Sequence, residues 1–173
     1  MKRLRIFIMV MAGLLATATV ARGENFQATL TGYEEVPVVS TVASGDFRAI
    51  VEDGNDHFHY SLTYSGLQGT ITQAHIHIAQ LSVNGSIVIW LCQTSTNPDP
   101  TGLSPQCPQA GTVTGRITAA NVIAGGTASQ QLNAGDFAGA LTAMRAGAAY
   151  ANVHTSPLSG GGEIRGQIRI IGK

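Results

Sequence analysis

The chain has 173 residues, of which 44% are hydrophobic and 12% charged, with ten basic and ten acidic side chains. This length is enough for one domain with a single buried core. Beyond residue 23 the basic residues form no cluster and no stripe with aromatic residues, which excludes nucleic acid and anionic membrane surfaces as partners.

The N-terminal segment 1–23 has the layout of an export signal. A basic start is followed by an apolar run over 6–20, too short for a comfortable membrane span, and then by small residues. A retained anchor helix is the alternative. We expect cleavage after Ala21 or Gly23, and assign 24–173 to one secreted or periplasmic domain that does not span the membrane. That domain keeps six basic and all ten acidic residues, a net charge of about −4.

Apolar and polar residues alternate through the rest of the chain, and each stretch ends in Gly, Pro, Asn or Asp. This pattern is typical of short antiparallel strands joined by turns. It predicts an all-β fold, an antiparallel Greek-key β-sandwich or barrel, with strands over 26–30, 47–51, 58–64, 71–78, 86–92, 112–118, 149–155 and 163–170. The 86–92 strand is nearly all apolar, so we expect it to be central and covered on both faces.

The two cysteines, Cys92 and Cys107, flank a stretch rich in Pro, Ser, Thr and Gln between two predicted strands. In an exported protein this spacing favours a disulfide. Closing a loop of about 15 residues would stabilise the fold by ~3 kcal/mol. A redox or zinc site of the Cys-x-x-Cys type does not fit the spacing.

One short helix is predicted over about 133–146. Asn133 and Asp136 resemble a capping pair, apolar residues recur on one stripe, and Gly147 closes the segment. We expect this helix to cover an open end of the sandwich or barrel.

Three histidines form the candidate metal site. His75 and His77 are separated by one residue, so both project from the same face of their strand. The same alternation turns His154 away from the core in the 149–155 strand. If the two strands are neighbours, the three imidazoles converge on the outer surface of the barrel and leave an open coordination position that would suit copper or zinc.

Other polar residues are weaker candidates for that site. Glu163 is either a fourth ligand, an acceptor for an imidazole N–H, or the partner of Arg165 or an exposed donor. His57 and His59 form a second outward pair beside an acidic turn, where an ordinary solvated strand end explains them.

The alternative to a metal site is a hydrogen-bonded cluster of the three histidines that joins strand ends without metal. No catalytic residue is predicted. The sequence has no nucleophile elbow, phosphate-binding loop or dinucleotide fingerprint, and its carboxylates are scattered among turns.

Five short motifs occur in order: Phe-Gln-Ala-Thr-Leu-Thr-Gly from residue 26 with Glu-Val-Pro-Val from 35, Tyr-Ser-Gly-Leu from 64, Ala-His-Ile-His from 74, Tyr-Ala-Asn-Val-His-Thr from 150, and Gly-Glu-Ile-Arg-Gly-Gln-Ile from 162. Together they resemble the CHRD (chordin-type) domain over about 26–170, with Val38 at the position of the family's usual second proline. The resemblance implies an extracellular β-sandwich or barrel.

The His-x-His pair with the later Val-His-Thr is also similar to the copper strands of copper/zinc superoxide dismutases. The sequence lacks that family's fourth copper histidine, its bridging histidine and its full set of zinc ligands. We therefore expect a non-enzymatic exported binding or structural module, with an unknown extracellular or cell-surface protein as its partner. A copper-dependent, dismutase-like metalloenzyme is the alternative, and docking through exposed edge strands is a third interpretation.

Overall fold

The computed structural model describes residues 23–52, 54–125, 130–157 and 161–172. The expected export signal lies outside these residues, apart from Gly23. The described residues form nine strands, one α-helix and two short 3₁₀ helices: β1 Glu24–Thr31, η1 Gly32–Glu34, β2 Ser44–Val51, β3 His57–Ser65, β4 Thr70–Ile78, β5 Ser86–Cys92, β6 Gly111–Thr118, η2 Ala119–Asn121, α1 Phe137–Arg145, β7 Ala149–Ser156, β8 Ile164–Gln167 and β9 Arg169–Gly172. In this part of the chain no helix has the length and apolar character needed to cross a membrane.

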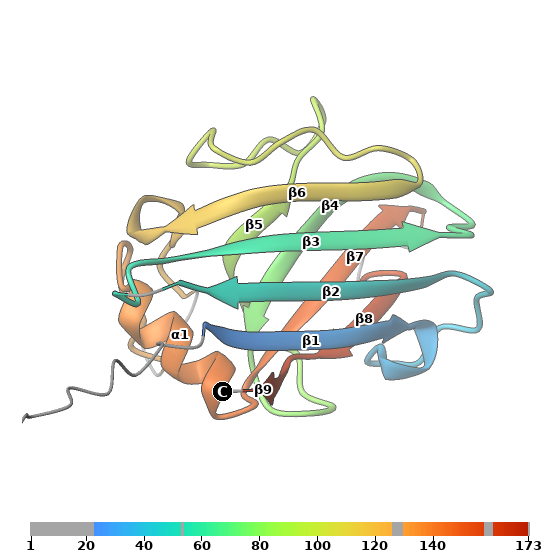
Figure 1. The fold of residues 1–173 in the computed structure, drawn as a ribbon. Helices are drawn as coiled ribbons and strands as arrows, with labels where there is room; N and C mark the ends of the chain where they lie inside the picture. The colour runs from blue at the N-terminus through green and yellow to red at the C-terminus, as the bar shows by residue number, and fades with distance from the viewer. Residues whose placement is uncertain (1–22, 53, 126–129, 158–160, 173) are drawn as a thin grey trace, which may run out of the picture.

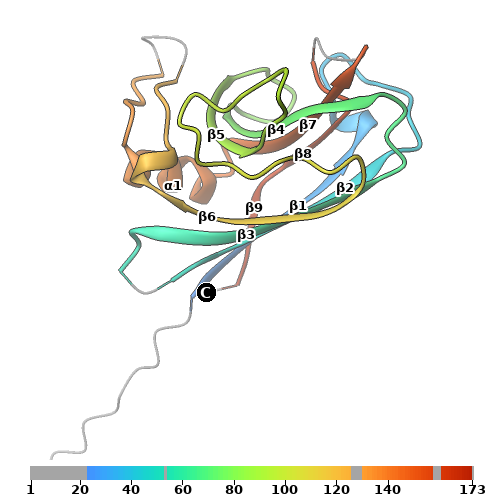
Figure 2. The same ribbon diagram turned by 90° about the horizontal axis from the view of Figure 1, so that it is seen from above.

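One antiparallel sheet folds over into two layers. The strand order is β5-β4-β7-β8-β1-β2-β3-β6, with β9 paired to β1. Figure 1 shows β6, β3, β2 and β1 in one layer and β5, β4, β7 and β8 in the layer behind it, and Figure 2 shows the two layers on edge. The end strands β5 and β6 approach each other, so the sheet is a nearly closed barrel. The predicted all-β class is confirmed.

The core lies between the two layers and follows the alternation of the sequence. On β3, Phe58 and Tyr60 are buried inward while His59 faces solvent. On β7, Ala151 and Val153 belong to the hydrophobic core, and the residues between them face the other side of their layer. Strands with one face in the core explain why the period-2 pattern was so regular.

Three details of the strands differ from the prediction. A register shift between Ile71 and Gln73 turns Ile71 into the core, although strict alternation from the buried Ala74 would turn Thr72 inward instead. The last predicted strand is divided at Ile168, because β8 pairs with β7 while β9 pairs with β1. Strand β5 is covered as expected but lies at one end of the sheet order, not at its centre.

The helix is present and shorter than predicted. It begins at Phe137, and the carboxylate of Asp136 caps it by accepting a hydrogen bond from Gly139 N–H at 2.8 Å. Asn133 does not cap it, because Gly135 adopts a positive φ of 81° and breaks the helical path. The apolar stripe of α1 packs into the core at one end of the sandwich, where Phe137 contacts Phe58 with ring centroids 5.8 Å apart.

The predicted disulfide between Cys92 and Cys107 is present, with the two Cα atoms 5.0 Å apart. Inside the bracketed loop, the buried carboxylate of Asp99 accepts hydrogen bonds from the backbone N–H groups of Thr101 and Ser104. The segment between the cysteines is therefore a compact loop held at both ends.

Candidate metal centre

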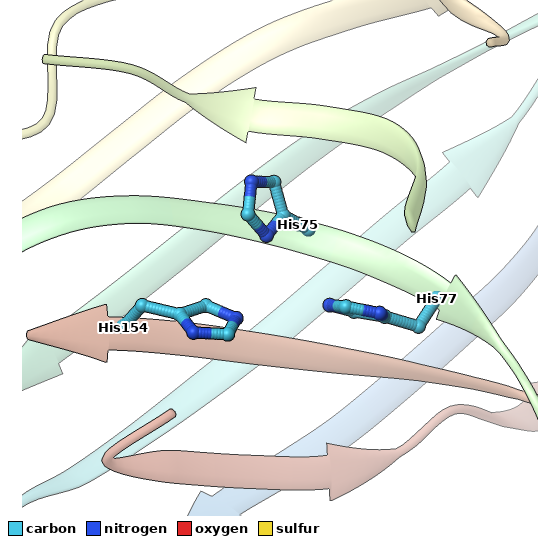
Figure 3. Close-up of side chains that lie close together, drawn as sticks. All are labelled: His75, His77 and His154. Carbon is cyan, nitrogen blue, oxygen red and sulfur yellow. The ribbon is translucent and has the colours of Figure 1, made fainter. Parts of the chain in front are cut away.

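Strands β4 and β7 bring the three predicted histidines together. The two strands are antiparallel neighbours, with His75 opposite Asn152 and His77 opposite Tyr150. His154 lies opposite Gln73, one step further along the same face. The adjacency on which the candidate site depended is therefore present, and Figure 3 shows the three imidazoles grouped over the two strands.

The imidazoles are close enough to share one metal ion. Ring centroids are 5.5 Å apart for His75 and His77, 5.1 Å for His75 and His154, and 5.9 Å for His77 and His154. Each ring offers one nitrogen such that all three nitrogens lie within 4.8 Å of one another. Three ligand atoms around a common point are what a tetrahedral site with one further position requires.

The prediction that this cluster lies on the outer surface was wrong. His75 is 0% exposed, His77 6% and His154 7%. The cluster is on the face of the sheet away from the hydrophobic core, as alternation required, but that face is covered. Trp90 of β5 packs against His75 with ring centroids 4.3 Å apart, and the connection 79–85 lies against His77.

Burial favours the neutral form of His75 and His77. Desolvation, together with the charges of His154 and His77, lowers the pKa of His75 well below its ordinary value. Desolvation also lowers the pKa of His77 to about 4, although its hydrogen bond to Gly85 acts in the opposite direction. Neutral imidazoles carry the lone pairs that metal ions bind.

Hydrogen bonding leaves nitrogens of this cluster available. His77 Nδ1 lies 3.0 Å from the carbonyl oxygen of Gly85, so Nδ1 carries the proton and Nε2 holds a lone pair. Among the described residues, His77 Nε2 and both ring nitrogens of His75 are buried and have no hydrogen-bond partner. Buried polar atoms in this condition are rare in native proteins.

A stack of side chains that the sequence analysis did not assign to the site lies beside His77. The ring of Tyr150 is parallel to His77, with centroids 4.7 Å apart, and the guanidinium carbon of Arg165 lies 3.5 Å from the Tyr150 centroid. Arg165 is fully buried and donates to the carbonyl oxygen of Val83 at 2.9 Å and to Asn84 Oδ1 at 3.2 Å. Arg165 thus holds in place the connection 79–85, which lies against His77.

A buried carboxyl group adjoins the same face. Glu35 Oε1 accepts a hydrogen bond from Asn152 Nδ2 at 2.6 Å, and Asn152 is the cross-strand neighbour of His75. Desolvation raises the pKa of Glu35 to about 8, despite the opposing effects of Asn152 and the Arg165 charge. Alternation along the 149–155 strand puts Tyr150 and Asn152 on the same face as His154. This pattern is the sequence feature from which the polar residues beside the histidines could have been predicted.

Glu163 does not join the three histidines. Its carboxylate accepts hydrogen bonds from the hydroxyl groups of Thr155 and Thr41 and from the backbone N–H groups of Gln68 and Gly69, at 2.6 to 3.2 Å. Burial opposes its charge, but these donors outweigh that effect and lower the pKa of Glu163. The donors are hydroxyl and backbone groups; among the described residues no ion pair forms between Glu163 and Arg165.

The comparisons with known proteins give one finding. The family model described as CHRD domain matches residues 26–168. No curated protein and no solved structure matches the chain significantly, so the similarity to superoxide dismutases has no support from relatives.

Proposed function

The chain belongs to the CHRD domain family, and from this premise we propose that it is an exported binding module that carries one copper or zinc ion on His75, His77 and His154. Residues 1–23 act as its export signal, and residues 24–173 are the mature domain in the extracellular space or periplasm. Its macromolecular partner is an extracellular or cell-surface protein. The approach of β5 to β6 leaves little open sheet edge, which favours a partner that binds loops or faces.

The observation that supports the metal is the set of buried nitrogens. An unsatisfied buried polar atom costs about 1–3 kcal/mol. His77 Nε2 and one ring nitrogen of His75 would lose this cost on binding a single ion; the other nitrogen of His75 carries the ring proton. A purely structural cluster would instead be expected to satisfy these atoms, so the metal explains the arrangement better.

The residues fit a transition metal with nitrogen ligands. Three imidazole ligands suit copper and zinc, and copper(II) binds nitrogen sites more tightly than zinc(II) does. The Gly85 carbonyl accepts a hydrogen bond from His77 Nδ1–H and so orients the ring. Metal-binding histidines are usually oriented by such a hydrogen bond from the nitrogen that does not bind the metal. Trp90 and Tyr150 enclose the cluster with aromatic surface and limit access of water.

The same enclosure argues for a module and against turnover. A dismutase-like enzyme must admit its substrate to the metal, whereas His75 has no exposed surface. An assay of superoxide consumption by the copper-loaded protein separates the two functions, and we expect no activity above that of free copper controls.

The test is a metal titration followed through Trp90, the only tryptophan of the chain. We expect one equivalent of copper(II) to change Trp90 emission in the wild type, because Trp90 contacts His75 directly. The His75→Ala/His77→Ala variant should show no change. Gln73→Ala, on the same strand and opposite His154, is the matched control and should behave as the wild type.

Thermal unfolding gives a second measurement that does not depend on fluorescence. Metal at 100 times its Kd stabilises a protein by about 2.7 kcal/mol, which raises the Tm. If the double variant does not fold, His154→Gln replaces it. Copper that binds without altering Trp90 emission or the Tm would place the metal elsewhere and leave the three histidines as a structural cluster.

A further inference from the structure

A second set of metal-ligating side chains lies in the opposite layer of the sandwich. His57 and His59 belong to β3. Glu52 comes immediately after the end of β2, the strand that pairs with β3. Because Phe58 between the histidines faces the core, both imidazoles face away from it. Strand β3 lies in the layer across the core from β4 and β7, so this set shares no residue with the buried histidines (Figures 1 and 2).

The two histidines converge on one carboxylate. His57 Nε2 lies 3.3 Å from Glu52 Oε2, and His59 Nε2 lies 3.5 Å from Glu52 Oε1. The rings meet edge to face, with centroids 5.4 Å apart. One ligand atom from each of the three residues lies within 4.8 Å of the others. Two imidazoles and one carboxylate on a single ion are a ligand set used by zinc and other first-row metals.

A carboxylate outside this set orients His57. Asp56 Oδ1 accepts a hydrogen bond from His57 Nδ1–H at 2.6 Å, so the lone pair is on Nε2, the nitrogen that lies beside Glu52. Metal-binding histidines commonly have such an outer carboxylate, and its removal weakens the metal typically 10–100-fold.

We propose that Glu52, His57 and His59 form a solvent-facing site for a divalent first-row ion such as zinc. The side chains of Glu52 and His59 are 54% and 52% exposed, so the remaining coordination positions are open to water or to a donor from another molecule. The positive charge of Arg116, opposite His59 on β6, opposes binding. This site should therefore bind more weakly than the buried histidines and exchange its metal faster.

Calorimetric titration with zinc(II) tests the site in the full chain. Glu52→Gln and His59→Ala should each bind one equivalent less than the wild type at micromolar zinc. Asp56→Asn should keep the equivalent with an affinity about tenfold lower, since only the outer carboxylate is lost. Asp46→Asn removes a carboxylate from the exterior of β2, where it pairs with Arg48, and should bind zinc as the wild type does.

The outcome does not depend on the buried histidines. If the buried site also binds zinc, the wild type takes up two equivalents and Glu52→Gln one; if it does not, the numbers are one and none. Equal stoichiometry in the wild type, Glu52→Gln and His59→Ala would overturn the proposal, and the three side chains would then be an ion-pair network only. Unchanged zinc-induced shifts of the His57 and His59 imidazole NMR signals in Glu52→Gln would contradict it equally.

Discussion

The pairs His75/His77 and His57/His59 have the same spacing in two strands of one sheet, yet they lie in opposite environments. The first pair is buried, meets a third histidine and has a backbone carbonyl and aromatic rings as neighbours. The second is at a strand end in contact with solvent, and its neighbours are the carboxylates of Glu52 and Asp56.

The difference shows that strand alternation places histidines on a common face but does not define their chemistry. At the buried cluster, desolvation lowers the pKa of His75 and His77 and leaves neutral ligands without negative charge beside them. At the exposed set, Glu52 supplies a ligand and Asp56 orients His57, and water solvates these charges so that their desolvation energy is small. Three predictions make this contrast measurable.

The largest effect is expected at the two arginines that adjoin these regions. Arg165→Ala removes the stack on Tyr150 and leaves the Val83 carbonyl without its buried donor, so we expect a loss of about 4 kcal/mol in the free energy of unfolding. Arg116→Ala, opposite His59, should change it by less than about 0.5 kcal/mol. Urea unfolding of metal-free protein measures both values, and similar losses in the two variants would remove the contrast.

A second effect concerns the pH dependence of stability at Glu35. Its pKa is raised from an ordinary value of 4.5 to about 8, so between these values the folded state binds more protons than the unfolded state. The contribution of Glu35 is therefore complete below pH 4.5 and is lost as the pH rises towards 8. Glu35→Gln should stabilise the protein by about 3 kcal/mol at pH 7 and by almost nothing at pH 4.

The matched variant in the exposed set is Glu52→Gln, for which we expect a change below about 0.5 kcal/mol at both pH values. The contributions of the buried histidines are common to wild type and Glu35→Gln and cancel in the difference. A Glu35→Gln variant whose stability relative to wild type is the same at pH 4 and pH 7 would show that folding does not raise the pKa of this carboxyl group.

The smallest effect is expected at Tyr150. Its hydroxyl oxygen accepts a hydrogen bond from Gly85 N–H at 3.2 Å, and the Gly85 carbonyl orients His77. Tyr150→Phe keeps the ring stack and should cost about 1 kcal/mol in unfolding free energy. It should also weaken copper at the buried cluster, followed by Trp90 emission, and leave zinc at the exposed set unchanged. Unchanged copper affinity would show that the Gly85 contact does not support the site.

Much of the fold could be read from the sequence because local patterns govern it. Alternation predicted the strands, and the cysteine spacing predicted the Cys92–Cys107 disulfide. The errors occur where tertiary contacts override a local pattern. The register shift that turns Ile71 inward and the change of strand partner at Ile168 both depend on pairing with distant strands, which no local pattern predicts.

The sequence was sufficient to predict which residues form the candidate site, but not how deeply they are buried. The alternation of side chains along a strand predicted that His75, His77 and His154 face away from the core, because the backbone of a strand sets that alternation. It could not give their burial, which depends on Trp90 and on a connection fastened by Arg165, a residue 80 or more positions away from its acceptors along the chain.

By itself, therefore, the sequence determined the strand faces, the disulfide and the three histidines, since each follows from spacing along the chain. Only the tertiary structure decided that β4 lies beside β7, that the cluster is enclosed, and that Glu163 bonds to Gln68 and Thr41 instead of joining the histidines. These outcomes depend on how segments distant in the sequence pack together in the state of lowest free energy. The low-dielectric environment that lowers the pKa of His75 and His77 arises only from that packing.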